Sequence, residues 1–241
     1  MIMRLKLSKF IEDVISLSAS RFFVVGLAFL AGVFLARILG PTKQGIITTL
    51  LVVPSIIITF ADLGMRQAAT YYLGKQIYDD QSVVSTVLLM TVFTSVLSIA
   101  IAFVVYQVSG YGELYGYTVF LFPLLYIPLQ LFLQFSNGIL MAKQRIRSIA
   151  IANILTEIIY IVLLIPLLLV DIYQVEYTLL VYVISSLLVV VFVAGIIRQY
   201  ANLRPSYIPG LPWKFLKLGI VYGLALFILS MNYRIDILIL E

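Results

Sequence analysis

Residues 14–39 read VISLSASRFFVVGLAFLAGVFLARIL, a run whose only charged residues are Arg21 and Arg37. The hydrocarbon core of a bilayer is about 30 Å thick, and a helix needs about 20 apolar residues to cross it. Basic residues precede the run, as they do in a signal peptide, at Arg4, Lys6 and Lys9. The run is too long for a signal peptide and lacks a clear small-residue cleavage site, so it predicts a retained membrane-spanning helix.

Runs of the same kind fill most of the remaining chain. They lie at 46–70, 82–108, 116–141, 148–170, 177–197 and 214–240. Of the 241 residues, 63% are hydrophobic and only 11% are charged, which is outside the range of soluble globular proteins. The sequence therefore predicts an all-α polytopic membrane protein with about seven transmembrane helices.

Basic residues are distributed unequally between the two ends of these predicted helices. Twelve of the sixteen lie in the N-terminal segment and in the connections after the second, fourth and sixth helices. The opposite connections carry only Arg37 and Lys43, together with the acidic Glu113, Asp171 and Glu176. The positive-inside rule therefore places the N-terminus in the cytoplasm, and we expect a multi-pass protein of the plasma membrane, the inner membrane of a bacterial or archaeal cell.

The composition excludes several kinds of chemistry and partner. The chain has no Cys and no His, which excludes thiol chemistry, disulfides and Cys/His zinc sites. A basic stripe for nucleic acid would need a soluble surface, and almost none is predicted. No connection is long enough to hold a soluble catalytic domain. We therefore expect a protein that is not an enzyme, with no cofactor, no metal site and no nucleic-acid partner.

One connection, residues 198–213, differs from the others by its length and its helix-breaking residues. These are Pro205, Pro209, Gly210 and Pro212. Six predicted helices precede this segment and one follows it, and transporters are commonly built from repeated helical halves. We expect an N-terminal six-helix transmembrane lobe at 1–197, a cytoplasmic linker at 198–213, and the first helix of a second lobe at 214–241, whose remainder, the C-terminal lobe, is missing.

Short motifs lie at the ends of these predicted helices. They are LARILGP at 35–41, ADLGM at 61–65, GILMAKQR at 138–145 and NYRID at 232–236. This ordered set resembles the N-terminal half of the polysaccharide-transport branch of the multidrug/oligosaccharidyl-lipid/polysaccharide flippase superfamily, which includes O-antigen flippases. One departure is Gln44, where the family often has an aromatic residue.

The resemblance implies a transporter that turns an undecaprenyl-pyrophosphate-linked oligosaccharide from the inner to the outer leaflet. Such a protein works by alternating access between two six-helix lobes. Its partners would be the lipid-linked oligosaccharide, membrane lipids and a coupling cation, either H⁺ or Na⁺. Because the resemblance covers about half of a usual family member, residues 1–241 alone are not expected to be a competent transporter.

Two predicted helices carry polar residues along one face. Gln130, Gln134 and Asn137 recur at i, i+4 and i+7, and Asn153 and Glu157 are four residues apart. Residues at these spacings share a face of a helix. We expect them to line a transport cavity, because large polar groups are costly to bury in hydrocarbon. The alternative is that they form hydrogen bonds between helices.

Charged residues inside the predicted helices complete the candidate site. Arg21 is a candidate to hold pyrophosphate by forked hydrogen bonds; the alternatives are a structural ion pair and an anchor at the membrane surface. Glu157 is a candidate to pair with Arg21, to bind a coupling cation or to act as a proton site. Arg234 and Asp236, near the outer end of the last helix, are further cavity candidates that could also neutralise each other.

Two other classes of function stay open on the sequence. A cation-coupled multidrug antiporter of the same superfamily would share the helices but depend on Glu157 and Asp236 more than on Arg21. A non-transporting membrane scaffold, or an enzyme that acts on prenyl-linked sugars, is the alternative of another class.

Small residues in the last helix predict a close helix contact. Gly219 and Gly223 are four residues apart, a spacing that lets two backbones approach each other. The contact is expected either at the interface between lobes or within one lobe.

Overall fold

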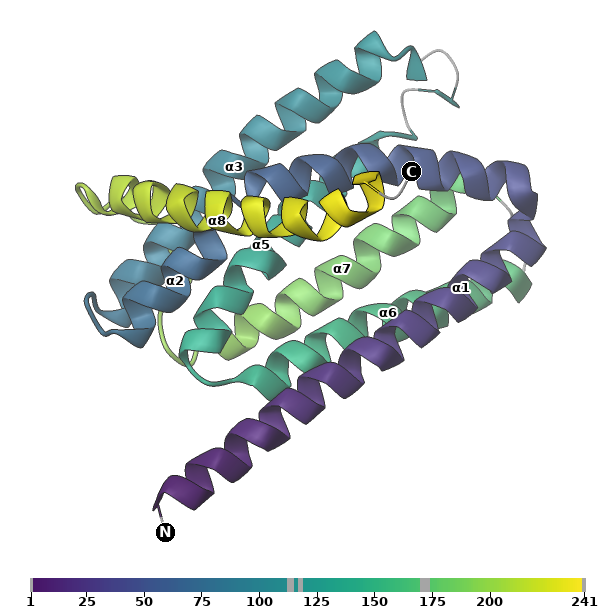
Figure 1. The fold of residues 1–241 in the computed structure, drawn as a ribbon. Coiled ribbons are helices and arrows are strands. Elements are labelled where there is room, and N and C mark those ends of the chain that lie inside the picture. The colour runs from purple at the N-terminus through teal and green to yellow at the C-terminus, as the bar shows by residue number, and fades with distance from the viewer. Residues whose placement is uncertain (1, 112–114, 117–118, 170–173, 240–241) are drawn as a thin grey trace.

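The computed structural model is helical, with no strand among the residues that it describes (Figure 1). These are residues 2–111, 115–116, 119–169 and 174–239, and the side chains of 2–14, 16, 38, 168–169 and 226–239 lie outside the description. Six helical segments within it are long and apolar enough to cross a membrane. The prediction of an all-α polytopic membrane protein is therefore confirmed.

Helix α1 (Ile2–Ala61) comprises two membrane helices that meet at a bend. Gly40 has φ 75° and ψ 165° at the bend, a conformation that residues with a Cβ rarely adopt, and Pro41 follows it. The candidate spans on the two sides are Leu17–Arg37 and Leu39–Ala61. Figure 1 shows the two halves of α1 diverging from this bend, so that they form two sides of a wedge.

The second predicted span, 46–70, is wrong at its C-terminal end. α1 ends at Ala61, and after a short turn a separate helix, α2 (Met65–Gly74), begins. The chain leaves the helix because Leu63 (φ 41°) and Gly64 (φ 68°) adopt left-handed conformations. Hydropathy alone did not reveal this break, because α2 is also rich in apolar residues, which it buries inside the protein.

The other helices agree with the predicted spans to within five residues, the largest difference being at the start of α5. They are α3 (Asp80–Val108), α5 (Leu121–Ala142), α6 (Ile146–Leu169), α7 (Val175–Ile197) and α8 (Leu211–Ile239). Helix α8 overlaps the last predicted span, 214–240, but it is not one of the six candidate spans found among the described residues, so a seventh membrane crossing stays a prediction. Its role as the first helix of a second lobe, and the lobe boundaries at 197 and 214, stay predictions.

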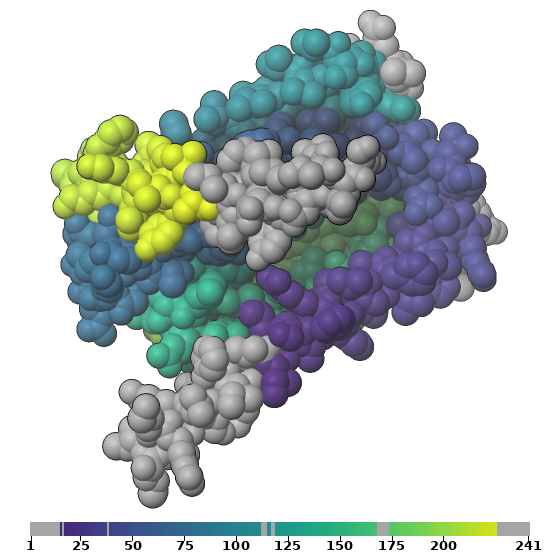
Figure 2. All heavy atoms as spheres, viewed as in Figure 1, coloured from purple at the N-terminus to yellow at the C-terminus, as the bar shows by residue number. Residues whose placement is uncertain are grey.

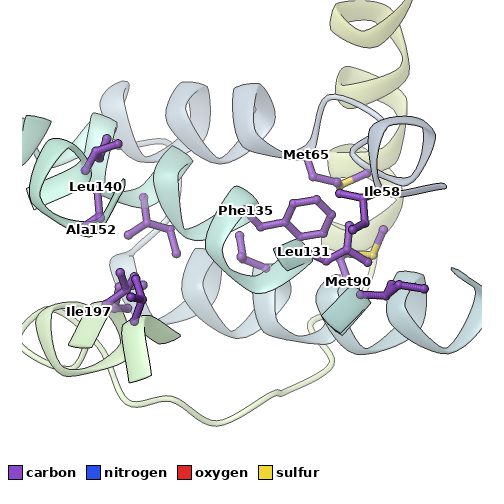
Figure 3. Close-up of a cluster of buried hydrophobic side chains, with 14 of the residues drawn as sticks. Ile58, Met65, Met90, Leu131, Phe135, Leu140, Ala152 and Ile197 are labelled. Atoms are coloured by element: carbon purple, nitrogen blue, oxygen red, sulfur yellow. The ribbon is translucent and has the colours of Figure 1, made fainter. Parts of the chain in front are cut away.

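Helix α5 lies at the centre of the bundle and contacts α1, α2, α3, α6 and α7. Leu131, Phe135 and Leu140 are fully buried along it. Figure 3 shows Leu131 and Phe135 near Ile58 and Met65, which belong to α1 and α2. In lipid, van der Waals packing of this kind replaces much of the hydrophobic driving force between helices. Truncating Phe135 to alanine would cost about 3–5 kcal/mol of stability.

Three basic connections lie at the same end of the bundle and are joined by polar contacts. Lys143 forms an ion pair with Asp80 at the start of α3. Arg145 Nε donates to the hydroxyl of Tyr200, just after α7, at 2.7 Å. We call this end, formed by residues 75–79, 143–145 and 198–210, the basic end. Its existence agrees with the charge pattern from which the cytoplasmic side is predicted.

The chain has no native cysteine, so single cysteines can test the predicted orientation without background. Cysteines introduced at Gln76, Gln144 and Tyr207 are expected to react with a membrane-impermeant maleimide only in inverted vesicles. Cysteines at Gly110 and Gln174 are expected to react only in right-side-out vesicles, because they lie beyond the other ends of the spans. Labelling of Gln144 and Gln174 positions from the same side would contradict this topology.

Candidate functional site

A polar cleft runs along the bundle, lined by the first half of α1 and by the helices that face it. It consists of three hollows that share lining residues. Arg21 and Arg66 line the first, Arg21 and Glu157 the second, and Glu157 and Gln44 the third. Figure 2 shows a hollow between the dark purple first half of α1 and the second half above it. Green spheres of the α6–α7 region form the floor of this hollow.

The hollow nearest the basic end has a volume of about 620 Å³. Its wall includes two arginines, Arg21 on α1 and Arg66 on α2, and the asparagines Asn137 and Asn153. Helix α8 contributes Tyr222 to the same wall. Within the residues that the structure describes, neither arginine forms an ion pair with a carboxylate. The carboxylate of Asp62 lies within electrostatic reach of Arg66 and offsets part of its charge. An anion that enters the hollow therefore meets the charge of Arg21 and the partly compensated charge of Arg66.

The middle hollow, of about 410 Å³, brings together six of the eight predicted site residues. They are Arg21, Gln130, Gln134, Asn137, Asn153 and Glu157. The spacing within α5 and within α6 puts each set on one face, and the packing of the two helices beside α1 directs both faces to the same space. The roles of these residues in binding stay predictions. The other two, Arg234 and Asp236, have side chains outside the described part of the chain.

The two glutamines of α5 differ in their hydrogen bonding. Gln130 Nε2 donates to the hydroxyl of Ser186 on α7 at 3.1 Å, so it joins two helices. Gln134 Oε1 is buried and has no hydrogen-bond partner. A buried acceptor without a partner costs about 1–3 kcal/mol unless water or a ligand supplies a donor. A hydrogen bond between helices, the alternative to cavity lining, therefore describes Gln130, whereas the buried Oε1 atom of Gln134 makes no such bond.

Glu157 lines both the middle hollow and the third hollow, which we call the outer hollow. Arg21 and Glu157 share the middle hollow, but no ion pair joins these two described residues. The structure therefore does not form the ion pair that is one of three hypotheses for Glu157. No group of three or more acidic side chains suited to a metal ion occurs among the described residues.

The outer hollow, of about 360 Å³, lies between the two halves of α1 near the bend. Gln44 Nε2 donates to the carbonyl oxygen of Gly32 at 3.3 Å, which joins the two halves. The rings of Tyr160 and Tyr182 line the same hollow with their centroids 4.1 Å apart. Apolar and aromatic surface with a few placed polar groups is typical of pockets for organic ligands.

Arg66 is a charged lining residue that the sequence pattern does not assign to a site. The charge pattern counts it among the basic residues of a connection, whereas the structure places it on α2 and in the wall of the first hollow. The available signal was Gly64, because a glycine at a helix end permits the left-handed turn after which a new helix begins. Tyr182 was also not distinguishable from a core aromatic residue, since its side chain is largely apolar.

A helical bundle with six candidate spans and a polar cleft inside it defines a multi-pass α-helical membrane protein. The chain belongs to the family of polysaccharide biosynthesis proteins, whose family model matches residues 10–241. This family includes flippases and transporters, in agreement with the resemblance seen in the helix-end motifs. No curated protein and no solved structure matches the chain.

The unequal bonding of the two glutamines leads to a stability prediction. Gln130→Leu leaves the buried hydroxyl of Ser186 without its partner and is expected to destabilise the protein by about 1 kcal/mol. Gln134→Leu removes an acceptor that has no partner and is expected to leave the unfolding midpoint unchanged or raise it. Thermal unfolding of the two purified variants, side by side in one detergent, measures the difference. An equal loss of stability in both would be inconsistent with these hydrogen bonds.

Proposed function

We propose that this protein is a transporter, not an enzyme, that moves an undecaprenyl-pyrophosphate-linked oligosaccharide from the inner to the outer leaflet of the plasma membrane. The observation that carries the proposal is the cleft, where cationic and amide side chains gather inside a bundle with an apolar exterior. A hydrophilic headgroup does not cross hydrocarbon unaided, because its polar groups lose their hydrogen bonds to water. The side chains of the cleft can replace part of those bonds. Membership of the polysaccharide biosynthesis family supports the proposal.

The proposed partner of Arg21 is the pyrophosphate of the lipid-linked substrate. Arg21 lines both the hollow at the basic end and the middle hollow. A guanidinium group stays charged at any physiological pH and binds phosphate oxygens through two parallel hydrogen bonds. Because the basic end is the predicted cytoplasmic end, a headgroup that enters from the inner leaflet meets this guanidinium early on its path.

The proposed path of the sugars lies beyond Arg21, along the amide side chains of the middle hollow. Gln134 and Asn153 offer uncharged donors and acceptors, which suit hydroxyl groups of many orientations. Tyr126 and Tyr182 add aromatic surface next to Glu157. A wall of neutral polar groups binds a glycan weakly, which favours its release on the other side.

The prenyl chain of the substrate can stay in the bilayer during this movement. The first half of α1 exposes large apolar side chains such as Phe22 and Phe29, which suit contact with lipid. Among the described residues, α1 and α8 do not contact each other, although both line the hollow at the basic end. We therefore propose that the lipid chain passes between α1 and α8. We propose that a second helical lobe completes the site, and that alternating access follows from its movement against this one.

Replacement of Arg21 tests the proposed headgroup site. Arg21→Ala is expected to reduce export by at least about tenfold, because it removes charge-assisted hydrogen bonds. Arg21→Lys is expected to restore export only in part, since a lysine keeps the charge but not the fork. The measurement is surface polysaccharide, together with lipid-linked oligosaccharide accumulated inside, in cells that make each variant at equal level.

Arg37→Ala is the matched control for these variants. Arg37 is an exposed arginine of α1 that lines none of the three hollows, so its removal is expected to leave export unchanged. Export at the unmodified rate by Arg21→Ala, with normal expression, would show that Arg21 is only an anchor.

A second candidate function is the cation-coupled multidrug antiporter, favoured by the position of Glu157 as the carboxylate that lines two hollows. Glu157→Gln keeps the shape of the side chain and removes its charge. If the antiporter assignment holds, this variant abolishes drug resistance while Arg21→Ala leaves resistance intact. If the flippase proposal holds, Arg21→Ala impairs polysaccharide export and neither variant changes drug resistance. Both readouts are measured in the same strain, so one experiment separates the two functions.

A further inference from the structure

The turn after α1 and the first two residues of α2 are enclosed by backbone on two sides. We call this segment, residues 62–66, the elbow. Leu63 and Gly64 have positive φ angles of 41° and 68°. Gly64 also serves as the N-cap residue of α2, with no side-chain cap. The elbow ends with Arg66, which lines the same hollow as Arg21. The path of the elbow therefore decides where this second cationic group lies.

Helix α8 closes one side of the elbow by direct contact between backbones. A Cβ added to Gly64 would lie 2.1 Å from the carbonyl oxygen of Gly219, and one added to Gly219 would lie 2.5 Å from that of Leu63. Both distances are far shorter than a van der Waals contact, so neither position accepts a side chain unless the backbones move apart. Gly219 and Gly223 thus make the close helix contact that their spacing predicts, and its partner is the elbow.

Helix α5 closes the other side of the elbow in the same manner. A Cβ added to Gly138 would lie 2.3 Å from the carbonyl oxygen of Arg66. The hydroxyl of Thr70, one turn further along α2, donates to the carbonyl oxygen of Gly138 at 3.0 Å and to that of Arg66 at 2.9 Å. The backbone of Arg66 is therefore held against α5 by contact and by a shared hydroxyl.

The start of α8 is also attached to α2 close to the elbow. The hydroxyl of Tyr72 donates to the carbonyl oxygen of Lys214 at 3.2 Å, and its ring lies 4.8 Å from that of Phe215, which is fully buried. Lys214 Nζ in turn donates to the hydroxyl of Tyr78 at 2.8 Å. These contacts hold the basic-end half of α8 against α2, so a displacement of α8 must displace the elbow or break them.

We infer that the elbow is a positioning element that holds Arg66 on the same hollow as Arg21, so that the two guanidinium groups together select a prenyl diphosphate over a prenyl monophosphate. The inference rests on the proposed function, which places the headgroup in this hollow. One guanidinium fork can satisfy a single phosphate group, whereas a diphosphate has a second phosphate whose oxygens need further donors. Arg66 is then the specificity-determining residue, and Gly138, Gly219 and Thr70 are positioning residues that act through it.

The test is a ratio of affinities, which a general loss of folding does not change. The full-length protein in phosphatidylcholine nanodiscs is titrated with geranylgeranyl diphosphate and with geranylgeranyl monophosphate. The unmodified protein is expected to prefer the diphosphate by about tenfold or more, the order of one additional charge-assisted hydrogen bond. Arg66→Gln is expected to remove most of this preference while binding of the monophosphate persists through Arg21.

Glycine variants then test positioning. Gly219→Ala is expected to lower the preference severalfold, whereas Gly223→Ala, the matched control on the same helix, is expected to keep it. An alanine Cβ at Gly223 would come no closer than 3.5 Å to its nearest neighbour, an ordinary contact. Combining Gly219→Ala with Arg66→Gln is expected to cause no further loss beyond that of Arg66→Gln, because Gly219 acts through Arg66.

Thr70→Val keeps the experiment decisive if Gly219→Ala does not fold. Valine has nearly the shape of threonine but cannot donate to the carbonyl oxygens of Gly138 and Arg66, so a loss of preference in the same direction is expected. Because Thr70 itself lines the hollow, Thr70→Val is also combined with Arg66→Gln, and no loss beyond that of Arg66→Gln is expected if Thr70 acts through Arg66. An unchanged ratio in the folded positioning variants, or a further loss in the double variant, would overturn the inference. If the unmodified protein shows no preference and neither ligand binds more weakly in Arg21→Ala, the proposed function itself fails.

Discussion

Hydrocarbon offers no hydrogen bonds, and this constraint decides where the polar side chains of the protein lie. A charged group costs at least about 2.5 kcal/mol at the centre of a bilayer, even on the most lenient scale. The apolar exterior and the polar cleft are two results of the same cost. Gln134 on α5 and Asn153 and Glu157 on α6 point to a common interior because any other arrangement would expose them to lipid. The central position of α5, packed against five helices, makes that shared interior possible.

The break in the helix at residues 62–64 has consequences on three sides of the molecule. It ends the second membrane crossing at Ala61 and directs α2 to the basic end. It presents the backbone of Leu63 and Gly64 to Gly219 of α8, which packs closely against it. It also places Arg66 in the cleft, although nothing in the local hydropathy marks that residue as part of a site. A single left-handed turn thus joins the membrane-spanning bundle, the helix after the linker and the proposed headgroup site.

The polar stripe of α5 shows how one pattern can serve two purposes. Gln130 and Gln134 are one turn apart and share a face, yet Gln130 meets Ser186 of α7 while the acceptor of Gln134 meets no partner. The difference comes from α7, whose hydroxyl lies within reach of only the first of them. Period and polarity therefore identify the face that avoids lipid, but the neighbour on the next helix decides which of the two glutamines makes a hydrogen bond between helices.

The sequence by itself determined the membrane class, the approximate spans, the unequal charge of the two ends and six residues of the cleft, because hydropathy, charge and helical period are properties of neighbours along the chain. The motifs at the helix ends also indicated the family to which the chain belongs. Only the tertiary structure decided that the second span ends at Ala61, that Arg66 joins Arg21 on one hollow, and that Arg21 and Glu157 form no ion pair. Those features depend on contacts between residues far apart in sequence, such as Gly64 with Gly219 and Gly138 with Arg66, which no local pattern specifies.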